Sequence, residues 1–135
     1  MNSYQDLLKP HETETTQVLK KTNKKKVIKF ENYFFYKHSK IKSGAKRRKL
    51  TYSLSPEFLE SIFPRDFNCP ILNQKFNFDH RWSTPSLDRI CNDIGYEKEN
   101  VIWVSLKANQ IKNTADADLI LKIANYYSSL KNAGD

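Results

Sequence analysis

The sequence predicts an α+β fold: a small mixed core, flanking helices and a basic N-terminal arm. Two short segments rich in β-branched and aromatic residues, 86–90 and 100–104, predict neighbouring strands joined by a loop around Gly95. Helix patterns lie on both sides of these strands. The chain has 135 residues and a 39% apolar share, which suits one domain with one modest core.

Positive charge is concentrated in the first part of the chain. Residues 1–50 hold 14 Lys and Arg against 4 Asp and Glu, a net charge of +10, whereas the whole chain carries +8. Residues 1–29 are polar and end in a lysine-rich run that includes Lys24, Lys25 and Lys26. Few apolar groups are available there to offset the entropy of ordering. We expect a flexible arm that anchors nucleic acid, with a solvated tail that contacts nothing as the alternative.

A domain over residues 30–135 is expected to begin with a helix at 30–49. Its apolar residues recur at the spacing of one helical face, and they are Phe30, Tyr33, Phe34, Ile41 and Ala45. Its other side is basic and carries Lys37, Lys40, Lys42, Lys46, Arg47 and Arg48. Such a helix can pack on the core while it presents positive charge to phosphate.

Capping residues predict three further helices. Ser55 is a suitable N-cap before Pro56, since proline is favoured at the first helical position. Ser105 is a suitable N-cap for a helix that runs through residue 112. Asn113 or Thr114 is expected to cap the last helix, at about 115–131.

A short hairpin is predicted between the second helix and the central strands. Its strands are expected at 71–72 and 75–78, on either side of an Asn73-Gln74 turn.

Composition argues against several classes of protein. No apolar run approaches the roughly 18–20 residues that cross a membrane. The first residues lack the basic-then-apolar pattern of a secretion signal, which favours a cytoplasmic location. Cys69 and Cys91 have no CxxC or HxxxH spacing, so no structural zinc is expected.

Polar residues between 86 and 112 suggest a site for one metal ion. Asp88 lies on the first central strand and offers a carboxylate, and Asn109 lies on the following helix and offers an amide oxygen. Two oxygen ligands, with water in the other positions, suit Mg²⁺ or Mn²⁺. Such an ion would stabilise charge on a phosphodiester and on its leaving oxygen.

The motifs of this region resemble those of the HNH (ββα-metal) endonuclease superfamily, and most closely a phage and mobile-element branch of it. The resemblance covers residues 41–131. Its motifs follow one another in the order of that branch: AKRRKL at 45–50, LSPEFL at 54–59, CPIL at 69–72, SLDRI at 86–90, Gly95-Tyr96 and NVIWV at 100–104, then Asn109 and Lys112. Asn100 and Asn109 keep the nine-residue step of the superfamily.

The resemblance implies a ββα-metal core over about 69–112 and metal-dependent hydrolysis of DNA, one strand at a time. Asp88 and Asn109 fall on metal-ligand positions. Asn100 falls on the residue that braces the loop, and Lys112 on a basic residue near phosphate. Duplex DNA is the implied partner, and a bacterial cell that carries a phage or mobile element is the implied setting.

Arg89 departs from the family pattern. In the wider superfamily the residue after the metal-binding Asp is a His that activates water, whereas an arginine stays protonated and is a poor base. Arg89 is expected instead to hold the scissile phosphate. His80 is the candidate substitute base, with a surface histidine in a turn as the alternative.

Other interpretations stay open at this stage. Asp88 can instead form a salt bridge with Arg89 or with a nearby lysine. Arg89 also suits a catalytically weak or inactive DNA-binding protein that keeps the fold. Charge alone does not separate DNA from RNA, and both a monomer and a homodimer are compatible with the sequence.

Overall fold

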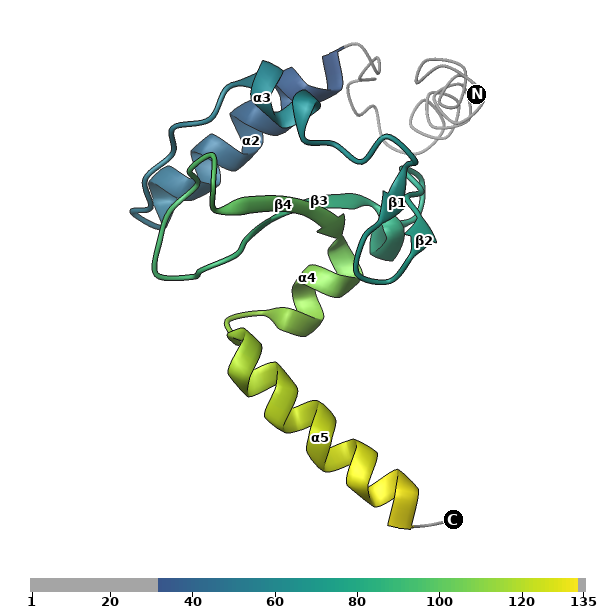
Figure 1. The fold of residues 1–135 in the computed structure, drawn as a ribbon. Coiled ribbons are helices and arrows are strands. Elements are labelled where there is room, and N and C mark those ends of the chain that lie inside the picture. Colours follow the sequence, from purple (N-terminus) through teal and green to yellow (C-terminus); the bar gives the residue numbers. More distant parts are fainter. Residues whose placement is uncertain (1–31, 134–135) are drawn as a thin grey trace.

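The computed structural model describes residues 32–133 as an α+β fold (Figure 1). The predicted class is therefore confirmed. The elements are α2 (Tyr33–Arg47), α3 (Pro56–Ser61), β1 (Asn68–Cys69), β2 (Gln74–Lys75), the 3₁₀ helix η2 (Arg81–Ser83), β3 (Pro85–Arg89), β4 (Val101–Ser105), α4 (Leu106–Lys112) and α5 (Ala117–Ala133). The expected arm at 1–29, with Lys24, Lys25 and Lys26, lies outside the described residues.

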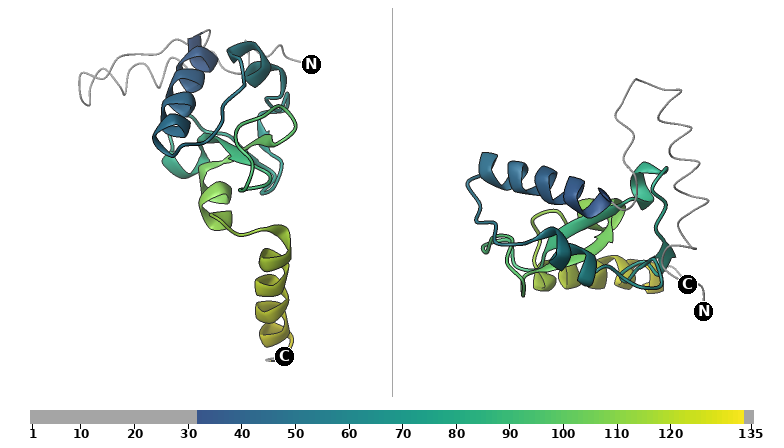
Figure 2. Two further views of the ribbon diagram at one scale, coloured as in Figure 1. Left: turned by 90° about the vertical axis from the view of Figure 1, so that its left-hand side faces the viewer. Right: turned by 90° about the horizontal axis from the view of Figure 1, so that it is seen from above.

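The antiparallel pair β3–β4 forms the centre of the domain, with α2 on one side and α4 on the other (Figures 1 and 2). The register pairs Leu87 with Trp103 and Asp88 with Ile102. Neighbouring residues of a strand point to opposite faces of the sheet. Leu87 and Trp103 therefore face the apolar core, and Asp88 faces α4.

Trp103 joins the helices to this central pair. Its side chain is 1% exposed, and its indole N–H donates a hydrogen bond to the Leu59 carbonyl on α3 at 2.9 Å. Its ring meets Phe34 of α2 and Phe63 edge-on, with centroids 6.1 and 5.6 Å apart. Edge-on aromatic contacts of this kind add to the stabilisation from apolar burial. The core thus lies between β4, α2 and α3.

The predicted N-caps of the second helix and of the helix after β4 are confirmed. The Ser55 hydroxyl accepts a hydrogen bond from the Phe58 amide at 3.1 Å, and Pro56 is the first residue of α3. The Ser105 hydroxyl accepts one from the Ala108 amide at 3.1 Å at the start of α4. Each hydroxyl satisfies an amide that has no partner within the helix.

The predicted hairpin strands are wrong in position. Asn68 pairs with Lys75 and Cys69 with Gln74, so residues 70–73 form the turn. Asn73 closes this turn with a φ of 51°, a left-handed conformation that asparagine tolerates. The buried sulfur of Cys69 accepts a hydrogen bond from the Ser105 amide at 3.3 Å. This link fixes the hairpin to the end of β4, a contact that short-range sequence patterns do not reveal.

The predicted cap of the last helix is also wrong. Asn113 has a φ of 49° and ends α4, while the Asp116 carboxylate accepts a hydrogen bond from the Leu119 amide at 2.8 Å. Helix α5 therefore begins at Ala117. None of its residues is buried, and it projects from the domain (Figure 1). Within residues 32–133, no helix is long and apolar enough to cross a membrane.

The loop between β3 and β4 is held close to the segment before α3. The Tyr96 amide donates to the Thr51 carbonyl at 2.8 Å, and the Ser53 amide donates to the Tyr96 carbonyl at 3.0 Å. A Cβ atom on Gly95 would lie 2.5 Å from the Thr51 carbonyl oxygen and 2.9 Å from its amide nitrogen. Only glycine permits this approach of two backbones.

We predict that Gly95→Ala lowers the free energy of unfolding by about 1–3 kcal/mol, because the added methyl group overlaps backbone atoms that cannot move independently. Gly44→Ala is the matched control, since a Cβ there would come no nearer than 3.7 Å to the side chains around it. Gly44→Ala should instead raise the free energy of unfolding by roughly 0.5–1 kcal/mol, because alanine is favoured over glycine within a helix. Urea unfolding of both variants checks this, and equal changes for the two would contradict the close approach.

Candidate functional site

Strand β3 and helix α4 bring four polar side chains together. Ser86 and Asp88 lie two residues apart on one face of β3, and Asn109 and Lys112 lie three residues apart on one face of α4. The Asn109 amide nitrogen donates to the Ser86 hydroxyl at 2.9 Å. The Lys112 ammonium donates to Oδ1 of Asp88 at 3.0 Å. The helix is thus joined to the strand by two parallel polar contacts.

The Asp88 carboxylate is buried and forms a salt bridge with the Lys112 ammonium. The residue is 5% exposed, and the Lys112 side chain beside it is 15% exposed. The same ammonium donates to the Arg89 carbonyl at 2.6 Å. A buried carboxylate needs such a partner because its desolvation is costly. The alternative of a salt bridge with a nearby lysine therefore describes Asp88 in this structure, and Lys112 is engaged by Asp88 rather than pointing freely toward a phosphate.

Arg89 has a structural role that the sequence did not indicate. As the next residue of the strand, it points to the opposite face from Asp88. Its guanidinium donates to the carbonyls of Asn92 at 2.7 Å and Ile94 at 3.2 Å, and it lies 5.6 Å from the centre of the Tyr96 ring. Three contacts hold it on the loop after β3. That Arg89 holds the scissile phosphate stays a prediction; in this structure its guanidinium contacts the loop, on the face of β3 opposite Asp88.

Asn100 binds the same loop from inside. Its side-chain oxygen accepts from the Cys91 amide at 2.8 Å, and its nitrogen donates to the carbonyls of Cys91, Ile94 and Gly95 at 2.9–3.2 Å. The residue is 7% exposed. This bonding matches the bracing position that the family resemblance implies for Asn100.

His80 lies on the surface in a turn. It precedes η2, and its backbone bonds to Asn77 and Ser83. The residue is exposed, and its imidazole makes no hydrogen bond to another described residue. The 3₁₀ helix η2 that follows it lies beside α4.

The available oxygen atoms suit a hard divalent cation. Within residues 32–133, no group of three or more His, Cys, Asp or Glu side chains is placed to hold a metal ion. Lys112 engages only Oδ1 of Asp88, and Asn109 directs its nitrogen to Ser86. Oδ2 of Asp88 and the side-chain oxygen of Asn109 accept no hydrogen bond from another described residue. Oxygen donors of this kind fit Mg²⁺ or Mn²⁺ that keeps several waters, with the Lys112 ammonium as a competing cation.

Ser86 is a site residue that sequence reasoning missed. The signal was available, because residues 86 and 88 share a strand face and the pattern of residues 109 and 112 places both on one helix face.

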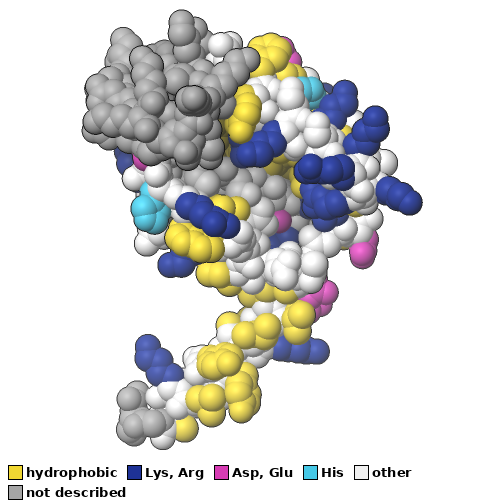
Figure 3. Space-filling view, turned by 180° about the vertical axis from the view of Figure 1, so that it is seen from behind, with side chains coloured by type: hydrophobic (Ala, Val, Ile, Leu, Met, Phe, Trp, Pro, Cys, Tyr) yellow, Lys and Arg dark blue, Asp and Glu magenta, His cyan; other side chains and the backbone are white. Residues whose placement is uncertain are grey.

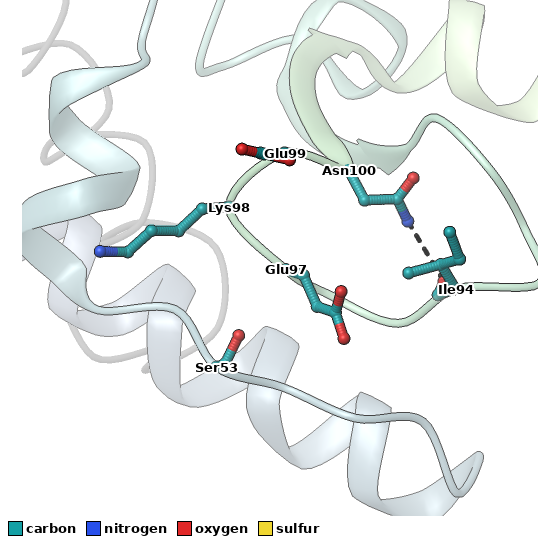
Figure 4. A pocket seen from close by; sticks show the side chains of 6 residues that line it. All are labelled: Ser53, Ile94, Glu97, Lys98, Glu99 and Asn100. Atoms are coloured by element: carbon teal, nitrogen blue, oxygen red, sulfur yellow. Dashed lines mark hydrogen bonds between the residues drawn. The ribbon is translucent and has the colours of Figure 1, made fainter.

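A hollow of about 540 Å³ lies elsewhere, beside the loop that Asn100 braces (Figure 4). Its lining does not include Asp88, Asn109 or Lys112, and consists of Ser53, Ile94, Glu97, Lys98, Glu99 and Asn100.

Exposed positive charge follows the outer side of α2 and the residues after it. Lys and Arg side chains gather on one side of the domain above α5 (Figure 3). The exposed basic residues of this segment are Lys40, Lys42, Lys46, Arg47, Arg48 and Lys49. Two of them have a side-chain partner, since the Arg48 guanidinium donates to the Tyr96 hydroxyl at 2.9 Å and the Lys40 ammonium donates to the Tyr36 hydroxyl at 3.3 Å. The remaining side chains form a surface that suits a polyanion.

Lys37 does not belong to this surface, contrary to the sequence prediction. Its ammonium donates to the Pro85 carbonyl at 3.4 Å and lies 5.9 Å from the centre of the Trp103 ring. Burial, with a smaller contribution from the nearby charge of Lys40, lowers the pKa of Lys37 from 10.5 to about 8. The side chain lies over the core, because the basic and apolar sides of α2 meet at this position.

No protein-family model, curated protein or solved structure matches this chain. The likeness to the HNH superfamily rests on the motifs quoted above.

The lowered pKa of Lys37 predicts a pH effect on stability. Between pH 8 and 10.5 the unfolded chain holds this proton and the folded chain releases it, so the free energy of unfolding gains on the order of 1–3 kcal/mol from this group as the pH rises. Lys37→Met should remove that gain, whereas the exposed Lys42→Met on the same helix should keep it. Urea unfolding from pH 7 to 10.5 measures the difference, and parallel curves for Lys37→Met and wild type would contradict the burial.

Proposed function

We propose that this chain is a metal-dependent DNA endonuclease of the HNH type, which hydrolyses a phosphodiester bond and cuts one strand at each encounter. The observation that carries the proposal is the arrangement of β3, β4 and α4, which directs Asp88 and Asn109 to the same side of the strand pair. The family motifs of the sequence fall on the same elements. Together they support a one-metal site at the junction of β3 and α4.

Asp88 and Asn109 would hold Mg²⁺ or Mn²⁺, and the bound ion would supply charge stabilisation to the phosphate and the leaving 3′ oxygen. Asn100 keeps the loop after β3 in place by its four hydrogen bonds. Lys112 lies beside the carboxylate at 3.0 Å, and once a metal ion takes its place the ammonium would be available to a phosphate oxygen. Arg89 remains on the loop and acts as a positioning residue for it.

The surface along α2 is the proposed DNA-binding face. Its exposed lysines and arginines neutralise phosphates without reading bases, and such contacts give affinity that falls as salt rises. Duplex DNA in a bacterial cell that carries a phage or mobile element is the proposed target and setting. The charge of the arm at 1–29 would add to the same interaction.

A second candidate is a DNA-binding protein that keeps this fold without catalysis. Two observations favour it. Arg89 stands where the family has its water-activating His, and the Lys112 ammonium already neutralises the carboxylate that a metal would use. The DNA-binding surface is the same in both candidates, so binding does not distinguish them and cleavage does.

We predict that the protein converts supercoiled plasmid to open circles with Mg²⁺ or Mn²⁺ and not with EDTA. Asp88→Ala should slow this conversion by about 10²–10³-fold, the range for loss of one electrostatic stabiliser of a transition state. Asp93→Ala is the matched control, because Asp93 is an exposed carboxylate in the adjacent loop. It should cut at the wild-type rate.

Thermal melts and DNA affinity of each variant, measured in parallel, separate loss of chemistry from loss of fold. A wild-type protein that binds plasmid without metal-dependent nicking establishes the second candidate. Undiminished nicking by folded Asp88→Ala rules out the assigned metal site.

A further inference from the structure

Helix α5 is an apolar surface without a covering element in the described part of the chain. Its 17 residues include no buried side chain, and it points away from the domain (Figures 1 and 2). Leu119 is 49% exposed, Tyr126 62% and Tyr127 67%. Apolar side chains run along the helix in the space-filling view (Figure 3). Exposed apolar surface of this extent marks an interaction site.

The apolar side chains of α5 form a stripe along one face of the helix. A central stripe follows steps of four, three and four residues, which is the spacing of a coiled-coil seam, and consists of Leu119, Ile123, Tyr126 and Leu130. One flank of the stripe is apolar and carries Ile120 and Tyr127. The other flank is polar and carries Lys122 and Ser129.

Two copies of this stripe match when the helices run antiparallel. Leu119 of one copy then faces Leu130 of the second copy, and Ile123 faces Tyr126 of the second copy. An antiparallel pair also sets equivalent flanks against each other, so the apolar flanks meet and the polar flanks meet. The helix dipoles run in opposite directions, and each end of the pair combines an N-terminus with a C-terminus.

A parallel pair lacks this match. It would set the apolar flank of one copy against the polar flank of the other, so that Tyr127 would face Lys122 of the second copy. It would also place both domains at the same end of the pair, because each domain precedes its α5. The antiparallel pair separates the two domains by the length of the helix, about 25 Å.

We propose that two copies of this chain associate through α5 as an antiparallel helix pair with twofold symmetry. Six apolar side chains from each copy, losing on the order of 100 Å² each, would bury about 1,200 Å², the lower limit of specific interfaces. The inference rests on α5 alone and stands whether or not the domain cuts DNA.

Sedimentation equilibrium of the full chain tests the association. The mass should rise toward twice the 15.9 kDa of one chain as concentration increases. Ile123→Lys should weaken the dimer by at least about 100-fold, because each of two copies loses a buried apolar side chain. Leu121→Lys is the matched control, since Leu121 is 58% exposed on the side of α5 away from the stripe, and it should dimerise as wild type does.

Disulfide trapping tests the direction of the helices. In a Cys91→Ser background, which removes the exposed native thiol, chains with Leu119→Cys are mixed with chains with Leu130→Cys and oxidised with diamide. The antiparallel pair predicts a covalent heterodimer from the mixture and little product from Leu119→Cys alone. The reverse pattern overturns the antiparallel arrangement.

A monomer at all concentrations up to about 1 mM overturns the proposal, whether the stripe is covered by the first 31 residues or by another protein. Equal weakening by Ile123→Lys and Leu121→Lys also overturns it. Both variants alter exposed positions outside the core, so we expect both to melt at the temperature of the wild type. Such melting temperatures would exclude unfolding as the cause of either result.

Discussion

A buried carboxylate must be neutralised, and at the centre of this domain that requirement falls on Asp88. The side chain is held between β3 and α4, and in this structure the ammonium of Lys112 meets it at 3.0 Å. Removing a charge from water costs several kcal/mol unless a partner compensates. The ion pair and the Asn109–Ser86 hydrogen bond beside it join α4 to the sheet.

Neighbouring residues of β3 point to opposite faces of the sheet and have different roles. Asp88 points to α4 and to the proposed metal and phosphate, whereas Arg89 points to the loop and holds the carbonyls of Asn92 and Ile94. Asn100, the residue just before β4, holds the same loop by its side-chain hydrogen bonds. An arginine at this position is consequently explained by the loop it stabilises, and the position gives no base. The proposed hydrolysis must therefore use a water activated by another group.

Much of the fold could be predicted from local patterns in the sequence. The two central strands and the caps Ser55 and Ser105 were predictable, because each depends on residues close in sequence. The hairpin is bonded to the end of β4 through Cys69 and Ser105, and Lys37 lies over the Trp103 ring. Such distant contacts leave no local pattern. For the site, residue types and spacing indicated Asp88 and Asn109, but not that Lys112 would occupy the carboxylate.

We propose that Asp88 is a cation site at which Lys112 and a divalent metal compete. Calorimetric titration of Mn²⁺ into folded wild type and Lys112→Met tests this most directly, with Lys107→Met as the exposed control on the same helix. The account predicts that Lys112→Met binds Mn²⁺ at least about tenfold more tightly than wild type, a change of about 1.4 kcal/mol, and that Lys107→Met binds as wild type does. Equal or weaker binding by Lys112→Met would contradict it.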